Sequence, residues 1–116
     1  MNTQQVADKL VAYCREGKNV DAIAELYADN VVSKEGNFPT VTGKEGVIGK
    51  NQQWYASVEE VHSATISDPI VTGNFFACTM EMDVTYKKSG RMGMSEIAVY
   101  HVKDGKIISD EFFYEM

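Results

Sequence analysis

The stretch "WYASVEEVHSATI", residues 54–66, decides the fold, because the spacing of the hydrophobic residues changes within it. Before Val61, apolar residues recur every three or four positions, as they do on the buried face of a helix. From Val61 onward they alternate with polar residues, as they do on a strand with one face in the core. The change predicts helices in the first half of the chain and a sheet in the second.

Three helices are expected before this change. Residues 3–16 place their apolar side chains on one face, and Gly17 is a natural stop. Asn19 can cap a second helix, whose apolar face continues to Tyr27. The sequence "TGKE", residues 42–45, matches a capping box and predicts the start of a third helix.

Strands are expected in the rest of the chain. Residues 78–86 alternate between apolar and polar side chains, which is typical of a half-buried strand. The pair Asp104-Gly105 is a strong hairpin signal. Three helices followed by a four-stranded meander predict a single α+β domain over residues 1–116, with the helices on one face of an antiparallel sheet.

The composition excludes several functions. The 116 residues carry a net charge of −6, which argues against a nucleic-acid partner. We expect no membrane partner, because no apolar stretch is long enough to cross a bilayer. The two cysteines lack metal-ligand spacing, so neither a metal nor another cofactor is expected. The first residues do not resemble a signal peptide, and a cytoplasmic location is therefore expected.

Three stretches together resemble the nuclear transport factor two-like superfamily, which includes ketosteroid isomerases and SnoaL-like polyketide cyclases. They are "VDAIAELYADNVV" (20–32), "TGKEGVIG" (42–49) and "IAVYHVKDGKIISDEFFYE" (97–115). The resemblance implies a cone-shaped α+β roll of the cystatin-like type, in which a strongly bent, mostly antiparallel sheet wraps around the helices. It also implies a pocket inside the cone and a homodimer formed by the outer face of the sheet.

The resemblance also implies roles for single residues. Glu35 matches the general base of the ketosteroid isomerases, and Tyr27 matches a tyrosine that ends their second helix. Their oxyanion tyrosine falls near Leu10, with Tyr13 about one turn away. Their protonated aspartic acid falls on Ala98, which cannot donate a hydrogen bond, so steroid isomerisation itself is not expected.

The strand pattern adds His62 to the candidates. His62 alternates with Ala64 and Ile66, and we therefore expect it to face Glu35 across the cone and to exchange a proton with it. Each residue also has a simpler interpretation, because Glu35 can be a solvated loop charge and a lone histidine on an apolar face is usually a core residue.

The candidate site combines these residues with others that share their faces. The expected catalytic residues are Glu35, His62, Tyr13 and Tyr100, the two tyrosines being donors to an enolate oxygen. Asp110 is expected to be a solvated charge. The expected ligand-binding residues are Tyr27, Asn51, Trp54, Met80, Met82, Glu96, Ala98, Phe112 and Tyr114.

Three functions remain open at this point. The first is a cofactor-independent isomerase, cyclase or dehydratase that acts on a small apolar carbonyl compound. The second is a protein that binds a hydrophobic molecule without catalysis, and the third is a dimeric interaction module. For all three we expect a homodimer through Ile97, Val99 and His101, which have the opposite strand parity to the pocket residues.

Overall fold

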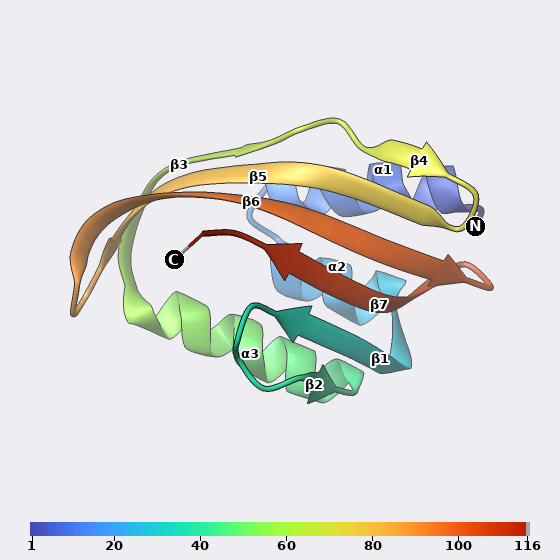
Figure 1. The fold of residues 1–116 in the computed structure, drawn as a ribbon, viewed down its shortest axis with the longest axis horizontal. Coiled ribbons are helices and arrows are strands. Elements are labelled where there is room, and N and C mark those ends of the chain that lie inside the picture. Colours follow the sequence, from blue (N-terminus) through green and yellow to red (C-terminus); the bar gives the residue numbers. More distant parts are fainter. Residues whose placement is uncertain (116) are drawn as a thin grey trace.

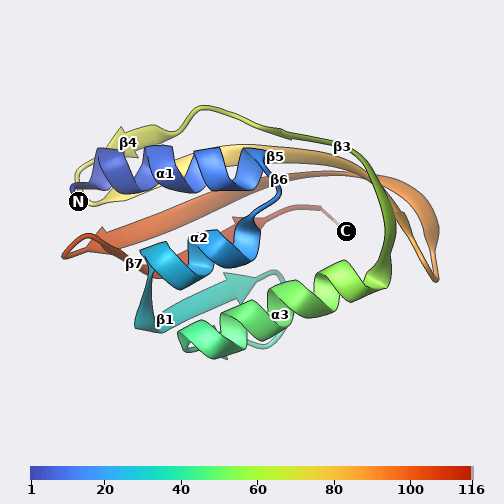
Figure 2. The ribbon, with the colours of Figure 1, turned by 180° about the vertical axis from the view of Figure 1, so that it is seen from behind.

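The computed structural model describes residues 1–115, and three helices pack on one face of a curved sheet (Figures 1 and 2). No helix in this part of the chain is long and apolar enough to cross a membrane. The helices are α1 (Thr3–Arg15), α2 (Asn19–Leu26) and α3 (Lys44–Ser57).

The helix ends agree only in part with the sequence signals. A capping box between Asn2 and Gln5 holds the start of α1, with hydrogen bonds of 2.8 and 2.9 Å. Gly17 follows α1 with a φ of 73°, a left-handed conformation that glycine adopts readily. The predictions that Asn19 caps the second helix and that residues 42–45 form a capping box are wrong. Helices α2 and α3 begin after Lys18 and Gly43, and neither residue makes a side-chain cap.

Within residues 1–115 the sheet has seven strands, which confirms the α+β class. The strand order is β2-β1-β7-β6-β5-β3, with β4 paired to β5. The pairing of β1 with β7 is parallel and the other pairings are antiparallel, so the sheet is mixed. The strands are β1 (Tyr27–Glu35), β2 (Val41–Thr42), β3 (Val58–Ile66), β4 (Ile70–Thr72), β5 (Phe75–Tyr86), β6 (Gly90–Lys103) and β7 (Lys106–Phe113).

The predicted meander corresponds to β3, β5, β6 and β7, and β1, β2 and β4 extend it. Tyr27 begins β1 instead of ending the second helix. Residues 27–35 therefore form a strand, which runs parallel to β7 and brings Glu35 level with Phe112.

Two irregularities in β3 bend the sheet. The register with β5 shifts by one residue between Val58 and Glu60 and again between Val61 and Ser63. Each shift inserts an extra residue on one side of the ladder, which bends and twists the strand locally. Figures 1 and 2 show the hairpin end of β5 and β6 curving around the carboxyl end of α3.

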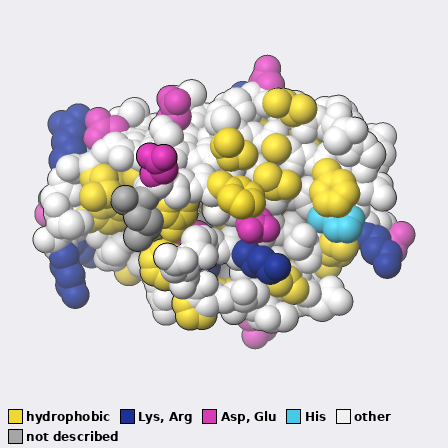
Figure 3. Space-filling model, viewed as in Figure 1, with side chains coloured by type: hydrophobic (Ala, Val, Ile, Leu, Met, Phe, Trp, Pro, Cys, Tyr) yellow, Lys and Arg dark blue, Asp and Glu magenta, His cyan; other side chains and the backbone are white. Residues whose placement is uncertain are grey.

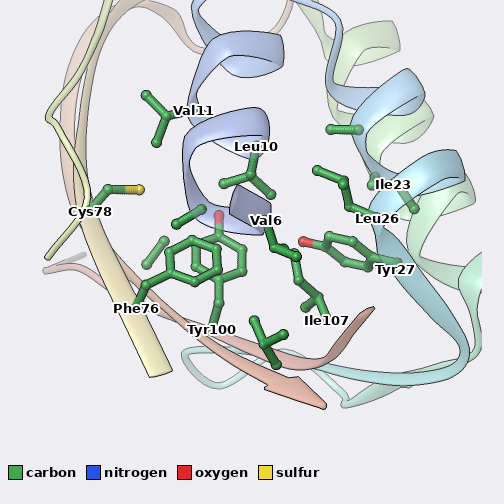
Figure 4. Packing of buried hydrophobic residues seen from close by; sticks show 14 of the residues in the cluster. Val6, Leu10, Val11, Ile23, Leu26, Tyr27, Phe76, Cys78, Tyr100 and Ile107 are labelled. Atoms are coloured by element: carbon green, nitrogen blue, oxygen red, sulfur yellow. The ribbon is translucent and has the colours of Figure 1, made fainter. Parts of the chain in front are cut away.

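The hydrophobic core lies between the concave face of the sheet and helices α1 and α2 (Figure 4). Val6 and Leu10 of α1 pack there near Phe76 of β5 and Tyr100 of β6. The rings of Phe76 and Tyr100 stack with their centroids 4.5 Å apart. This packing fills one end of the concave face.

Candidate functional site

A cavity of about 540 Å³ lies on the concave side of the sheet, next to the core. Its size suits a small organic molecule. Helices α2 and α3 and strands β1, β3, β5, β6 and β7 all contribute side chains to it. Most of its wall is apolar, and the apolar lining includes Trp54, Val61, Ala64, Met80, Met82 and Met94.

One part of the wall is polar and centres on an ion pair. Lys50 of α3 places Nζ 3.1 Å from Oε1 of Glu35, the last residue of β1. The Tyr114 hydroxyl donates to Oε2 of Glu35 at 2.9 Å. The ammonium of Lys50 also lies 3.2 Å from the Ser33 hydroxyl and 5.4 Å from the centre of the Phe112 ring.

The second carboxylate of the cavity wall is Asp110 of β7, which is only 2% exposed. The Tyr27 hydroxyl donates to its Oδ2 at 2.5 Å, and its Oδ1 has no hydrogen-bond partner among the described residues. Burial raises the pKa of Asp110. Three nearby groups act in the opposite direction and lower it, namely the hydroxyls of Ser33 and Tyr27 and the positive charge of Lys50.

The third carboxylate is Glu96 of β6, opposite Met80 in the sheet. Burial in the apolar cavity raises the pKa of the Glu96 carboxyl to about 7. The negative charge of Glu35 adds to this rise, and Lys50 counteracts it. A carboxyl group that titrates near neutral pH can both take up and release a proton under ordinary conditions.

Neutral polar groups complete the wall. The Trp54 indole donates to the Tyr86 hydroxyl at 3.2 Å, and that hydroxyl points to the sulfur of Met94 at 2.8 Å. Asn51 also lines the cavity, and its buried Oδ1 has no hydrogen-bond partner in residues 1–115. These contacts fix the aromatic surfaces, and the Asn51 amide oxygen is left without a hydrogen bond within the described residues.

The expectation that His62 faces Glu35 is wrong. The His62 ring lies outside the cavity, with Nδ1 2.8 Å from Oε2 of Glu60 and Nε2 2.7 Å from the Thr85 hydroxyl. The physical reason is the register shift in β3, where His62 is the extra residue. The shift reverses the strand parity, so that Val61 lines the cavity in the place that strict alternation assigned to His62.

Two other candidates also lie away from the cavity. Tyr13 extends along the contact between α1 and α2, where its hydroxyl donates to Glu25. Ala98 is fully buried in the core, between Cys78 and Phe112 of the neighbouring strands. Its methyl group is too short to pass these neighbours, so the expected contact with a ligand is not present.

The structure brings the remaining predicted residues together around the cavity. They are Tyr27, Glu35, Asn51, Trp54, Met80, Met82, Glu96, Tyr100, Phe112 and Tyr114. Within the part of the chain that is described, no group of three histidine, cysteine or acidic side chains is arranged to hold a metal ion.

Sequence reasoning missed Asp110 and Lys50. Asp110 was expected to be solvated, although it has the same strand parity as Phe112 and Tyr114, which were expected to face the pocket. Lys50 lies one helical turn before Trp54 on α3. Strand parity and helical spacing were the two signals that could have identified these residues.

Comparisons with known proteins agree with this fold. A family model described as "SnoaL-like domain" matches residues 1–114, and no curated protein matches the chain. A putative SnoaL-like polyketide cyclase from Mesorhizobium loti is 32% identical with a TM-score of 0.89, over 98% of this chain and 100% of that one.

Two more distant structures share the fold. A protein from Xanthomonas campestris with a cystatin-like fold is 16% identical with a TM-score of 0.84, over 100% of this chain and 92% of that one. A protein from Catenulispora acidiphila with a ketosteroid isomerase-like fold, solved in complex with trimethylamine, is 20% identical with a TM-score of 0.79, over 99% and 88% of the two chains.

Proposed function

The chain belongs to the SnoaL-like domain family, and from this premise we propose that it is an enzyme for a small, mostly apolar carbonyl compound. It moves a proton next to the carbonyl group without a cofactor, as an isomerase, cyclase or dehydratase does. The family's fold also hosts proteins that only bind ligands, so the chemistry must be argued from the site.

The observation that carries the proposal is the position of Glu96 in an apolar cavity. Its carboxyl has a pKa of about 7, so roughly half of the molecules hold a usable base near neutral pH. The cavity is large enough for a small ketone, and its largely apolar walls give the reacting atoms surroundings of low polarity.

The proposed reaction uses two groups of the wall. The Glu96 carboxylate takes a proton from the carbon next to the carbonyl, and the electron pair of that bond moves to the carbonyl oxygen as an enolate. Tyr100, which lines the cavity from the same strand, donates a hydrogen bond to the enolate oxygen. The protonated Glu96 then returns the proton to carbon, at the same or at a neighbouring position.

Glu35 stays the alternative base. Lys50 and Tyr114 already occupy both of its oxygens, which favours Glu96 as the proton acceptor and Glu35 as the group that positions Lys50. The two assignments differ in an experiment. Proton transfer in Glu35→Gln should still rise with pH, because Glu96 is intact, but the midpoint of the rise should move below about 7, because the negative charge of Glu35 no longer raises the pKa of Glu96.

The test is hydrogen exchange in heavy water with a β,γ-unsaturated cyclohexenone and with acetophenone as probes. We expect the protein to speed deuterium uptake next to the carbonyl, with a rate that rises with pH through about 7 as Glu96 ionises. Binding of both probes in an NMR titration without faster exchange would contradict catalysis and support the non-catalytic binding function.

We also propose that the protein is a homodimer through the outer face of the sheet. Phe75, Ile97 and Phe113 of neighbouring strands are each about half exposed, and His101 stacks on Phe75 with ring centroids 4.2 Å apart. Figure 3 shows hydrophobic side chains gathered over these strands. A contiguous exposed apolar patch of this kind is typical of an interface.

Val99→Asp is expected to convert this dimer into a monomer, because Val99 lies in the middle of the patch, between Ala77 and Glu111. Burying an unpaired carboxylate in an interface is strongly unfavourable. Light scattering coupled to size-exclusion chromatography measures the result. Gln53→Asp on the exposed face of α3 is the control and should stay dimeric, and a wild-type monomer at micromolar concentration would refute the proposal.

A further inference from the structure

Acidic side chains outnumber basic side chains in the cavity wall. Three carboxylates line it, from Glu35, Glu96 and Asp110, and Lys50 is the one basic side chain among the described lining residues. Nζ of Lys50 lies 3.1 Å from Oε1 of Glu35, so the charges of these two residues largely cancel. Glu96 and Asp110 have no basic residue of their own at hydrogen-bond distance within residues 1–115.

Asp110 is an independent sign of a missing partner. It is 98% buried and lines the cavity, Tyr27 donates to one of its oxygens and the Ser33 hydroxyl lies nearby, but its Oδ1 makes no hydrogen bond within the described residues. A buried carboxylate is costly unless donors or a positive charge compensate it. A ligand that brings a positive charge into the cavity would supply that compensation.

The neutral part of the wall also suits a cation. Aromatic residues from four elements line the cavity, namely Trp54 of α3, Tyr86 of β5, Tyr100 of β6 and Phe112 of β7. The faces of such rings attract ammonium groups. Lys50 already uses one of them, because its Nζ lies 5.4 Å from the centre of the Phe112 ring. The other three are free of any basic side chain in the described part of the chain.

We propose that the compound bound in this cavity carries a cationic amine group, which lies among the carboxylates of Glu35, Glu96 and Asp110. The inference rests on the proposed function only in that it concerns the same cavity. It narrows the substrate class to small amines with an apolar body, and it excludes carboxylic acids, whose charge would add to an existing excess of negative charge.

A cationic ligand also completes the proposed chemistry. A positive charge near Glu96 favours its ionised form, so binding releases the proton of Glu96 and produces the base when the substrate is present. The same charge offsets the negative charge of an enolate, which the surrounding carboxylates would otherwise destabilise. The substrate thereby supplies the positive charge that the wall lacks.

The test compares three probes of the same shape that differ in charge. They are choline, the neutral alcohol in which a tert-butyl group replaces trimethylammonium, and the carboxylate of tert-butylacetic acid. In NMR titrations of the full chain, we expect choline to bind on the order of tenfold more tightly than the alcohol. The carboxylate should bind most weakly. Equal affinities of choline and the alcohol would overturn the proposal.

Two variants test whether the cation binds in this cavity. Glu96→Gln should remove most of the advantage of choline over the neutral alcohol, measured as the ratio of the two affinities in the same variant. Glu81→Gln makes the same change of charge at an exposed position of β5 outside this cavity, and it should keep the full advantage. A choline preference that survives Glu96→Gln would place the cation elsewhere and contradict the proposal.

The binding test and the exchange test fail independently. A preference for choline together with no exchange of ketone protons would reject the proposed enzyme and keep the cation site. Exchange of ketone protons without any preference for choline would keep the proposed enzyme and reject the cation site.

Discussion

Glu96→Gln is expected to slow the proposed proton transfer by about 10²–10⁴-fold and, at the same time, to make the folded protein more stable above neutral pH. Glutamine has nearly the shape of glutamic acid but cannot accept the proton, so catalysis is lost while the packing around Met80 is kept. A residue with a purely structural role would not combine these two effects, since its loss would lower stability.

The stability gain follows from the pKa of Glu96. Folding raises this pKa from 4.5 to about 7, chiefly through burial, so the folded state holds the proton more tightly than the unfolded state. The stabilising contribution is complete below pH 4.5 and is lost as the pH rises through about 7. Glutamine removes this loss, which is on the order of 2 kcal/mol for a partly buried carboxyl.

Urea denaturation at about pH 5 and about pH 8 measures the effect, because the linear dependence on urea gives the free energy of unfolding at each pH. The wild-type protein should lose more stability than Glu96→Gln between the two conditions. Glu81→Gln, which is exposed, should behave like the wild type. If Glu96→Gln and the wild type changed equally with pH, Glu96 would not occupy an apolar environment and would lose its catalytic assignment.

The second large effect is expected from Phe76→Ala, which should lower the free energy of unfolding by about 3–5 kcal/mol. Phe76 is only 1% exposed and stacks on Tyr100 in the center of the core (Figure 4). Removing its ring leaves a cavity between β5 and α1 that the neighbours cannot fill completely. The loss of its support should also allow the Tyr100 ring to move.

Phe38→Ala is the matched control, since Phe38 is 58% exposed and the chemical change is the same. Its effect on stability should stay within about 0.5 kcal/mol. Thermal and urea denaturation followed by circular dichroism measure both variants. A loss below about 1 kcal/mol for Phe76→Ala would show that this end of the concave face is loosely packed, in contradiction to the structure.

Much of the fold could be predicted because local patterns repeat over many residues. The change of spacing near Val61 identified the helical and the extended halves of the chain, and the Asp104-Gly105 turn located a hairpin, in which both residues have positive φ values. Strand β1 was mostly missed, because its polar middle contains Asp29 and Asn30, which are rare in strands. Its pairing with β7, far along the chain, determines its conformation.

The residues of the candidate site could be predicted where side chains alternate regularly between the two faces of a strand. The prediction failed where this alternation is interrupted. Glu96 and Tyr100 line the cavity because β6 stays regular between them, and β5 keeps Met80 and Met82 there. His62 does not line the cavity, because the pairing of β3 with β5 shifts its register at that residue.

By itself, the sequence determined the α+β class, the family and most of the residues that surround the cavity, because hydrophobic spacing specifies which face of each element is buried. Which polar and charged groups meet depends on the tertiary structure. Lys50 pairs with Glu35, and Tyr27 with Asp110, across contacts between elements distant in the chain. The pKa of Glu96 depends on the burial and on the distances that these contacts set, since electrostatic interactions act through space and not along the sequence.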